Sequence, residues 1–220
     1  LLFPFMGWVV KATYRIVPGE DVCSTDAYEL KYIQPEGSVS PATAVVDGIH
    51  ELQQMGELAM NNLKMSMEAL CEPDEKKIKE VCEQEAYIDF LNRQITDYLV
   101  KISELDLPIA DAKILGGLFH VVNDIERIGD HAENFAEAAK ERMEKQIPFS
   151  EKAIRQIREM AEMVTEVLDY ALQMFSERST EHMKEVLQLE EAVDQLERKL
   201  QKAHVKRLTK GKCTPEASML

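Results

Sequence analysis

The sequence predicts an all-α protein, an antiparallel helix bundle, and three observations support that fold class. The 220-residue chain is rich in Glu, Lys, Ala, Leu and Met, which are residues that favour helices. Apolar residues recur every three or four positions over five long stretches, as they do in amphipathic helices. Short breaks separate these stretches, and short connections force neighbouring helices to run antiparallel.

The first two predicted helices are separated by the break at 72–75. The first begins near Ser40-Pro41, because serine is a good N-cap and proline is tolerated at the first helical position. The second covers about 74–104, with acidic residues in its first turn, where the helix dipole favours them. Its apolar stripe consists of Ile78, Val81, Ile88, Leu91, Ile95, Leu99 and Ile102.

Three more helices follow the same rules. The third begins after Leu107-Pro108 and ends before Pro148. Ser150 is a suitable N-cap for the fourth, whose apolar positions continue to Phe175. The fifth begins at Ser179 or Thr180. The apolar stripe of the third helix consists of Leu115, Leu118, Val122, Ile125, Gly129, Ala132 and Ala136. Its last three residues are small, so we expect them to let a neighbouring helix approach closely.

The N-terminal part of the chain does not show a helical pattern of this kind. Residues 15–40 contain several prolines and glycines and are interpreted as a linker. Residues 1–14 are apolar and aromatic, but the apolar run is only about half of the roughly 20 residues that a membrane-spanning helix needs. Two interpretations remain open: the end of a membrane domain, with aromatic and basic residues at the interface, or an apolar segment docked on the bundle.

The helical region, residues 41–220, contains an internal repeat. A shift of 105 positions aligns Glu85 and Asp89 with Glu190 and Asp194 in similar surroundings. Repeat one covers about 41–147 with three helices, and repeat two covers about 148–220 with only two. The segment that begins at Thr214-Pro215 has the residue order of a helix start. We therefore expect that repeat two lacks its last helix.

Charge and composition exclude several classes of function. The formal net charge of −14 argues against nucleic acid as a partner, since phosphate backbones attract Lys and Arg. The four cysteines have no zinc-site spacing, and no nucleophile–base arrangement or glycine-rich phosphate loop is present. We therefore expect a protein that is not an enzyme. A metalloenzyme of the di-iron bundle type would need histidine ligands, and no Glu-x-x-His spacing occurs.

Acidic pairs four residues apart are the most informative pattern in the chain. Residues four apart lie on one face of a helix, so each pair forms part of an acidic column beside the apolar stripe. Such oxygen ligands suit Mg²⁺, Mn²⁺ or iron, which makes a cation site one interpretation. A solvated acidic shoulder paired with nearby arginines is the other. The candidate metal ligands are Glu85, Asp89, Glu126, Asp130, Asn134, Glu190 and Asp194.

The two repeats, the three acidic pairs and the run from Glu126 to Asn134 together resemble the PhoU family of phosphate-response proteins. The resemblance covers about residues 41–220. Residues 2–5, followed by a linker containing Tyr32, are also similar to the join between the membrane domain of sodium/phosphate cotransporters and their cytoplasmic PhoU-like tail. The resemblance to the PhoU family implies two three-helix repeats, control of phosphate uptake, and metal ligands drawn from the acidic pairs.

On that resemblance we expect the regulatory domain of a Na⁺-dependent phosphate transporter, on the cytoplasmic side of the cell membrane, with the transporter's own membrane domain as its partner. Mg, Mn or Fe ions between the second and third helices would bias how the bundle docks on that domain. The alternative is a free-standing cytosolic adaptor that represses phosphate uptake. The sequence leaves open whether the module forms a homodimer.

Overall fold

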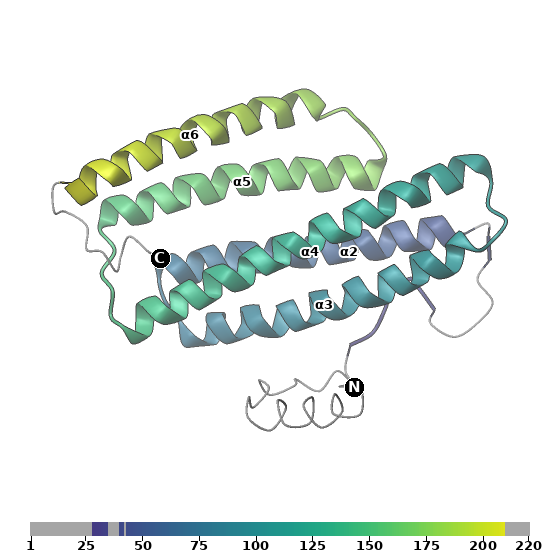
Figure 1. The fold of residues 1–220 in the computed structure, drawn as a ribbon, viewed down its shortest axis with the longest axis horizontal. Helices are drawn as coiled ribbons and strands as arrows, with labels where there is room; N and C mark the ends of the chain where they lie inside the picture. Colours follow the sequence, from purple (N-terminus) through teal and green to yellow (C-terminus); the bar gives the residue numbers. More distant parts are fainter. Residues whose placement is uncertain (1–27, 35–39, 42, 210–220) are drawn as a thin grey trace, which may run out of the picture.

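The computed structural model describes residues 28–34, 40–41 and 43–209, and within them the only regular elements are five helices. They are α2 (Ala44–Cys71), α3 (Glu75–Ser103), α4 (Ile109–Glu144), α5 (Glu151–Glu177) and α6 (Met183–Thr209). Consecutive helices run in opposite directions along one common axis (Figure 1). The predicted all-α fold class is therefore confirmed.

Helix α2 is the centre of the bundle. It packs against α3, α4 and α5, whereas α6 packs against α5 at the edge of the molecule (Figure 1). The largest hydrophobic cluster lies between α2, α3 and α4 and includes Leu52, Met55, Leu91 and Leu99, all fully buried. A second cluster continues toward the C-terminal end of α2 and joins α5 through Ala161, Val164 and Leu168.

The helix ends lie close to the predicted ones, except that two helices begin later: α2, described below, and α6, which begins at Met183 and not at the predicted Ser179 or Thr180. The Asp74 carboxylate accepts a bond from the Lys76 backbone N–H at 2.9 Å, and the Ser150 hydroxyl accepts one from Ala153 N–H at 3.2 Å. The first helix begins at Ala44, later than the predicted start near Ser40-Pro41. The Ser40 carbonyl instead accepts bonds from Thr43 and Ala44, which makes a turn ahead of the helix.

The described part of the predicted linker is anchored to the bundle. The carboxylate of Glu51 on α2 is fully buried and accepts hydrogen bonds from three consecutive backbone N–H groups, those of Lys31, Tyr32 and Ile33, at 3.1, 2.7 and 3.1 Å. The Tyr87 hydroxyl on α3 donates to the Glu29 carbonyl at 2.9 Å. Segment 28–34 is therefore irregular and is fixed to both α2 and α3.

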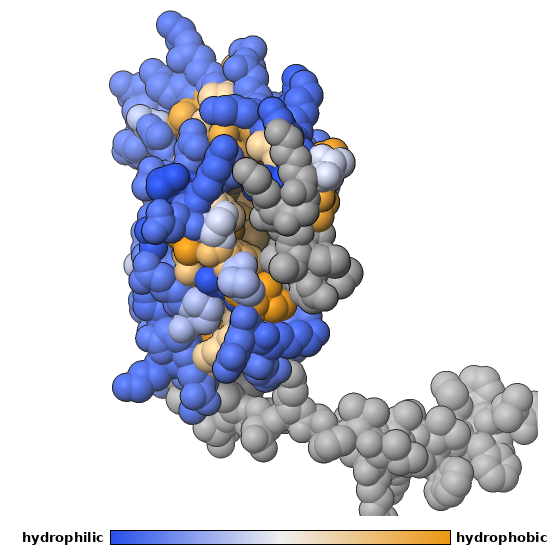
Figure 2. Space-filling view, turned by 90° about the vertical axis from the view of Figure 1, so that its left-hand side faces the viewer, coloured by the Kyte–Doolittle hydropathy of each residue, from blue (hydrophilic) through white to orange (hydrophobic). Residues whose placement is uncertain are grey.

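The face of the molecule in Figure 2 is mostly hydrophilic. Figure 2 shows the left-hand end of the bundle of Figure 1, where hydrophilic residues cover the outside and hydrophobic residues gather toward the middle. No helix in the described ranges is long and apolar enough to cross a membrane. Residues 1–14, the greater part of the linker and the predicted helix start at 214–217 lie outside the described residues.

Candidate metal site

The side chain of Glu85 lies in the contact between α3 and α4. Only 5% of its surface is exposed, because the residue opposite it on α4 is Gly129, which is also buried. A Cβ atom added at Gly129 would lie 2.5 Å from one carboxylate oxygen of Glu85 and 2.9 Å from the other. The absence of a side chain at this one position of α4 therefore leaves the space that the carboxylate occupies.

Neither carboxylate oxygen of Glu85 has a hydrogen-bond partner among the described residues. Burying an ionised carboxylate without a partner costs far more free energy than burying a neutral carboxyl group, so such a group either takes up a proton or binds a cation. Burial is the largest cause that raises the pKa of Glu85 to about 8. The negative charges that add to it come from Asp89, Glu133, Asp130 and Glu126.

Three further predicted ligands surround Glu85 at the edge of the same contact. Asp89 lies one turn along α3 and is exposed, as is Asp130 on α4, whereas Glu126 is half-buried. Burial and the charges of Asp130 and Asp89 raise the pKa of Glu126, while Arg127 opposes them. The charges of Asp89 and Asp130 thus raise the pKa of both Glu85 and Glu126, which places these two glutamates in one region of negative potential.

The side chains do not converge into a coordination shell as the bundle stands. Among the described residues, no three His, Cys, Asp or Glu side chains lie where they could hold one metal ion. Asn134 is exposed, and its amide donates to the backbone carbonyl of Asp130 at 2.8 Å. A cation at Glu85 would thus require new rotamers of the exposed acids, which solvent-facing side chains adopt readily.

The third acidic pair lies elsewhere. Glu190 and Asp194 are exposed on α6 and border a groove of about 510 Å³ between α5 and α6. Arg198 lies 3.2 Å from the Asp194 carboxylate, one turn away. This pair is therefore exposed to solvent and has Arg198 as a neighbouring positive charge. In the other two acidic pairs the predicted arginine partners are not seen: among the described residues, neither Arg93 nor Arg127 forms an ion pair.

Two residues matter more than the sequence pattern indicated. Glu133 was not among the predicted ligands, yet its charge is the second largest electrostatic influence on Glu85. Its helical spacing from Glu126 and Asp130, seven and three residues, places it on the same face. Gly129 was expected only to let a neighbouring helix approach, and its closer role is to make room for the Glu85 carboxylate.

Comparison with known proteins identifies relatives over most of the helical region. A family model described as the PhoU domain matches residues 52–139 and 157–220, more than half of the chain. No solved structure matches.

Three relatives are named as accessory proteins of phosphate-specific transport systems, PhoU homologs. The chain is 28% identical to the one from Clostridium acetobutylicum, over 68% of each protein. It is 29% identical to that of Aquifex aeolicus, over 68% of the chain and 66% of the relative. With PhoU homolog 1 of Thermotoga maritima it shares 25%, over 77% of the chain and 73% of the relative.

Proposed function

This chain belongs to the PhoU domain family, and from that premise we propose that it is an accessory regulator of inorganic phosphate transport across a membrane. The observation that carries the proposal is that the family model matches two separate segments, one in α2–α4 and one that begins in α5. The names of the relatives place them beside phosphate transporters, and the proposal extends that role to this chain. A regulatory role also requires no catalytic residues.

The free-standing form of this regulator is the one that the relatives favour, because they are named as accessory proteins of a transport system and not as transporters. It is the alternative that the sequence left open. The fused form, a regulatory domain of a sodium/phosphate cotransporter, rests on the apolar segment 1–14 and on the similarity of residues 2–5 to a transporter join. The upstream coding sequence separates the two forms, since only the fused one has several membrane-spanning segments before Leu1.

In this proposal the acidic contact between α3 and α4 is the part of the regulator that responds to a cation. Mg²⁺, Mn²⁺ or iron would supply the positive charge that the carboxylates lack. Glu85 would give the buried ligand, and Asp89, Glu126 and Asp130 the outer ones. The fit rests on the two unpartnered oxygens of Glu85 and on the space beside Gly129.

Neutralising these acids would remove the repulsion between α3 and α4. The proposed consequence is a change in how the bundle docks on the transporter at the cytoplasmic face, and so in transport. Helix α3 also holds segment 28–34 through Tyr87, so a shift of α3 would reach the N-terminal part of the chain. Glu190 and Asp194 take no part in this step, which makes them suitable control positions.

The function is tested by deleting the codons for residues 44–209 in the native host and measuring uptake of radiolabelled phosphate. A regulator that represses uptake predicts faster uptake in phosphate-replete cells after the deletion, and restoration by the intact gene. Unchanged uptake in replete and in starved cells would contradict the proposal.

The cation is tested on the purified protein. Protein prepared without chelator should contain Mg, Mn or Fe by elemental analysis, and adding back the ion after EDTA treatment should raise the unfolding temperature. At 100 times the dissociation constant the expected stabilisation is about 2.7 kcal/mol. It should be lost in Glu85→Gln and retained in Glu190→Gln. Metal-free protein whose melting does not respond to these ions would remove the cation from the proposal and leave the phosphate role untouched.

A further inference from the structure

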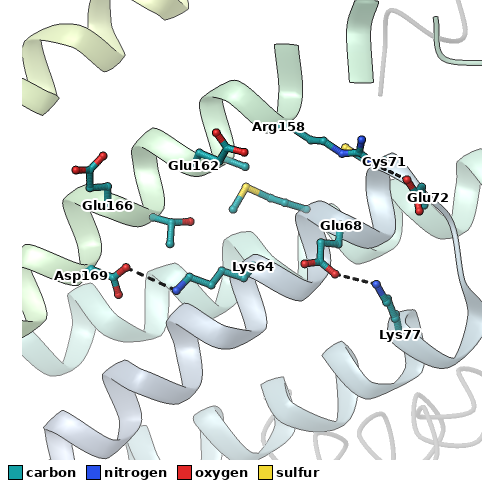
Figure 3. Close-up of a pocket in the computed structure, with 12 residues that line it drawn as sticks. Lys64, Glu68, Cys71, Glu72, Lys77, Arg158, Glu162, Glu166 and Asp169 are labelled. Carbon is teal, nitrogen blue, oxygen red and sulfur yellow. Dashed lines mark hydrogen bonds and ion pairs between the residues drawn. The ribbon is translucent and has the colours of Figure 1, made fainter. Parts of the chain in front are cut away.

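A second hollow lies on the seam between the two repeats, away from the acidic contact of α3 and α4. It has a volume of about 520 Å³ and runs between α2 and α5, with the start of α3 at one end (Figure 3). We refer to it as the seam groove. Met67 and Cys71 of α2 are buried in it, and Ala161 and Thr165 of α5 are half-buried, so its floor is largely apolar.

The positive charges at the edge of the seam groove are all neutralised. Lys64 lies 3.7 Å from Asp169, Lys77 lies 2.8 Å from Glu68, and Arg158 is bonded to Glu72. Figure 3 shows each of these pairs as a dashed line across or along the edge of the groove. No cation that lines the groove therefore remains for an acidic ligand.

Two carboxylates at the same edge are left without a counter-charge. Glu162 and Glu166 lie one turn apart on α5, are exposed, and have no ion pair or hydrogen bond among the described residues. They carry no dashed line in Figure 3. The seam groove thus combines an apolar floor with two unpaired negative charges spaced like the successive turns of a helix.

We propose that the seam groove is a docking site for a basic segment of a partner protein, one that presents arginine or lysine side chains among apolar residues. The apolar residues and the aliphatic stems of the basic side chains would cover Met67 and Ala161. The cationic ends would pair with Glu162 and Glu166, and arginine would do so with two hydrogen bonds. Methionine is a flexible side chain that adapts to such a partner.

The identity of the partner protein that supplies the basic segment rests on the proposed function, but the docking site itself does not. Cytoplasmic loops of membrane proteins carry an excess of Lys and Arg. A phosphate transporter therefore exposes segments of this chemistry on the side where the regulator is proposed to act. The seam groove would then be the surface by which the regulator engages the transporter.

The test uses the whole chain and a fluorescein-labelled synthetic peptide of leucine and arginine, with two arginines spaced i and i+4. Saturable binding is expected by fluorescence anisotropy. Glu162→Gln/Glu166→Gln should weaken the peptide's Kd about tenfold. The control Glu159→Gln/Glu185→Gln removes the same charge from exposed positions outside the groove and should leave the Kd unchanged. Peptides with citrulline for arginine, or serine for leucine, should bind more weakly.

The place of binding is read from NMR spectra of protein carrying ¹³C-methyl methionine. The Met67 signal, assigned with Met67→Leu, should shift on adding the peptide. No saturable binding, equal weakening by both double variants, equal binding of the citrulline peptide, or an unmoved Met67 signal would each overturn the proposal. None of these results bears on phosphate uptake, so the seam groove and the phosphate role can fail separately.

Discussion

The two repeats have the same spacing of acidic residues, but the first glutamate of the pair is buried in repeat one and exposed in repeat two. Glu85 in α3 is buried, without a hydrogen-bond partner, and has a pKa raised to about 8. Its counterpart Glu190 in α6 is exposed and borders an open groove. The difference is the third helix: α4 covers α3, whereas no described helix covers α6 in the same way. The sequence pattern places a glutamate at the same position of both repeats, and the presence or absence of a covering helix decides whether that glutamate is buried.

The apolar residues show the same contrast. Met55 and Leu63 of α2 are buried, but their counterparts Met160 and Leu168 of α5 are only half-buried. Helix α5 has no buried residue at all, although its apolar and polar faces are the most clearly separated of the five helices. An amphipathic face therefore marks where burial can occur, and a neighbour is needed to complete it.

The largest expected effect compares the cores of the two repeats. Leu91→Ala removes a fully buried side chain between three helices and should cost about 2–5 kcal/mol. Leu196→Ala removes its counterpart, which is also buried but lies in the smaller contact of α5 and α6, and should cost about 1–2 kcal/mol. Urea unfolding curves measure both. Equal losses would show that repeat two is as well packed as repeat one.

The next largest expected effect is on the pH dependence of stability, and it compares Glu85 with Glu190. The folded Glu85 carboxyl keeps its proton up to about pH 8, whereas the unfolded one loses it near 4.5, its ordinary pKa. The folded state then binds more protons, so stability falls as the pH rises from about 4.5 to about 8, by up to about 1.4 kcal/mol per pH unit. Glu85→Gln should remove this slope and stabilise the protein by on the order of 4 kcal/mol at pH 8.

The matched control is Glu190→Gln, which should keep the slope because Glu190 is exposed. Unfolding is followed in EDTA, since a bound cation would hide the repulsion. A slope that survives in Glu85→Gln, or disappears in Glu190→Gln, would contradict the assignment of the buried proton to Glu85.

The smallest expected effect is a difference in stability between alanine substitutions at two glycines of α4. Gly116 has open space around it, so Gly116→Ala should stabilise the helix by about 0.5–1 kcal/mol. Gly129→Ala has the same helical advantage but must displace the Glu85 carboxylate, and should leave the protein about 1–2 kcal/mol less stable than Gly116→Ala. If the two variants were equally stable and had the same pH dependence, Gly129 would have no part in the site.

The helices were predictable because each depends on nearby residues. Asp74 and Ser150 cap the helices that they precede, and the apolar spacing of Ile88, Leu91 and Ile95 identifies the face of α3 that is buried. The late start of α2 was missed because Ser40 uses its carbonyl in a turn. The anchoring of segment 28–34 by Glu51 was also missed, since the two are distant in sequence and no local pattern marks a buried carboxylate.

By itself the sequence determined the all-α class, the positions of the helices, the repeat and the rows of acids, because these follow from spacing along a helix with a known period. Only the tertiary structure decided that Glu85 is buried while Glu190 is exposed, and that an unpaired acidic edge lies over the seam between α2 and α5. The physical reason is that the desolvation of an acidic side chain depends on which helix covers it and on how closely that helix approaches. For Glu85 the close approach of α4 depends on Gly129, which is distant in the sequence.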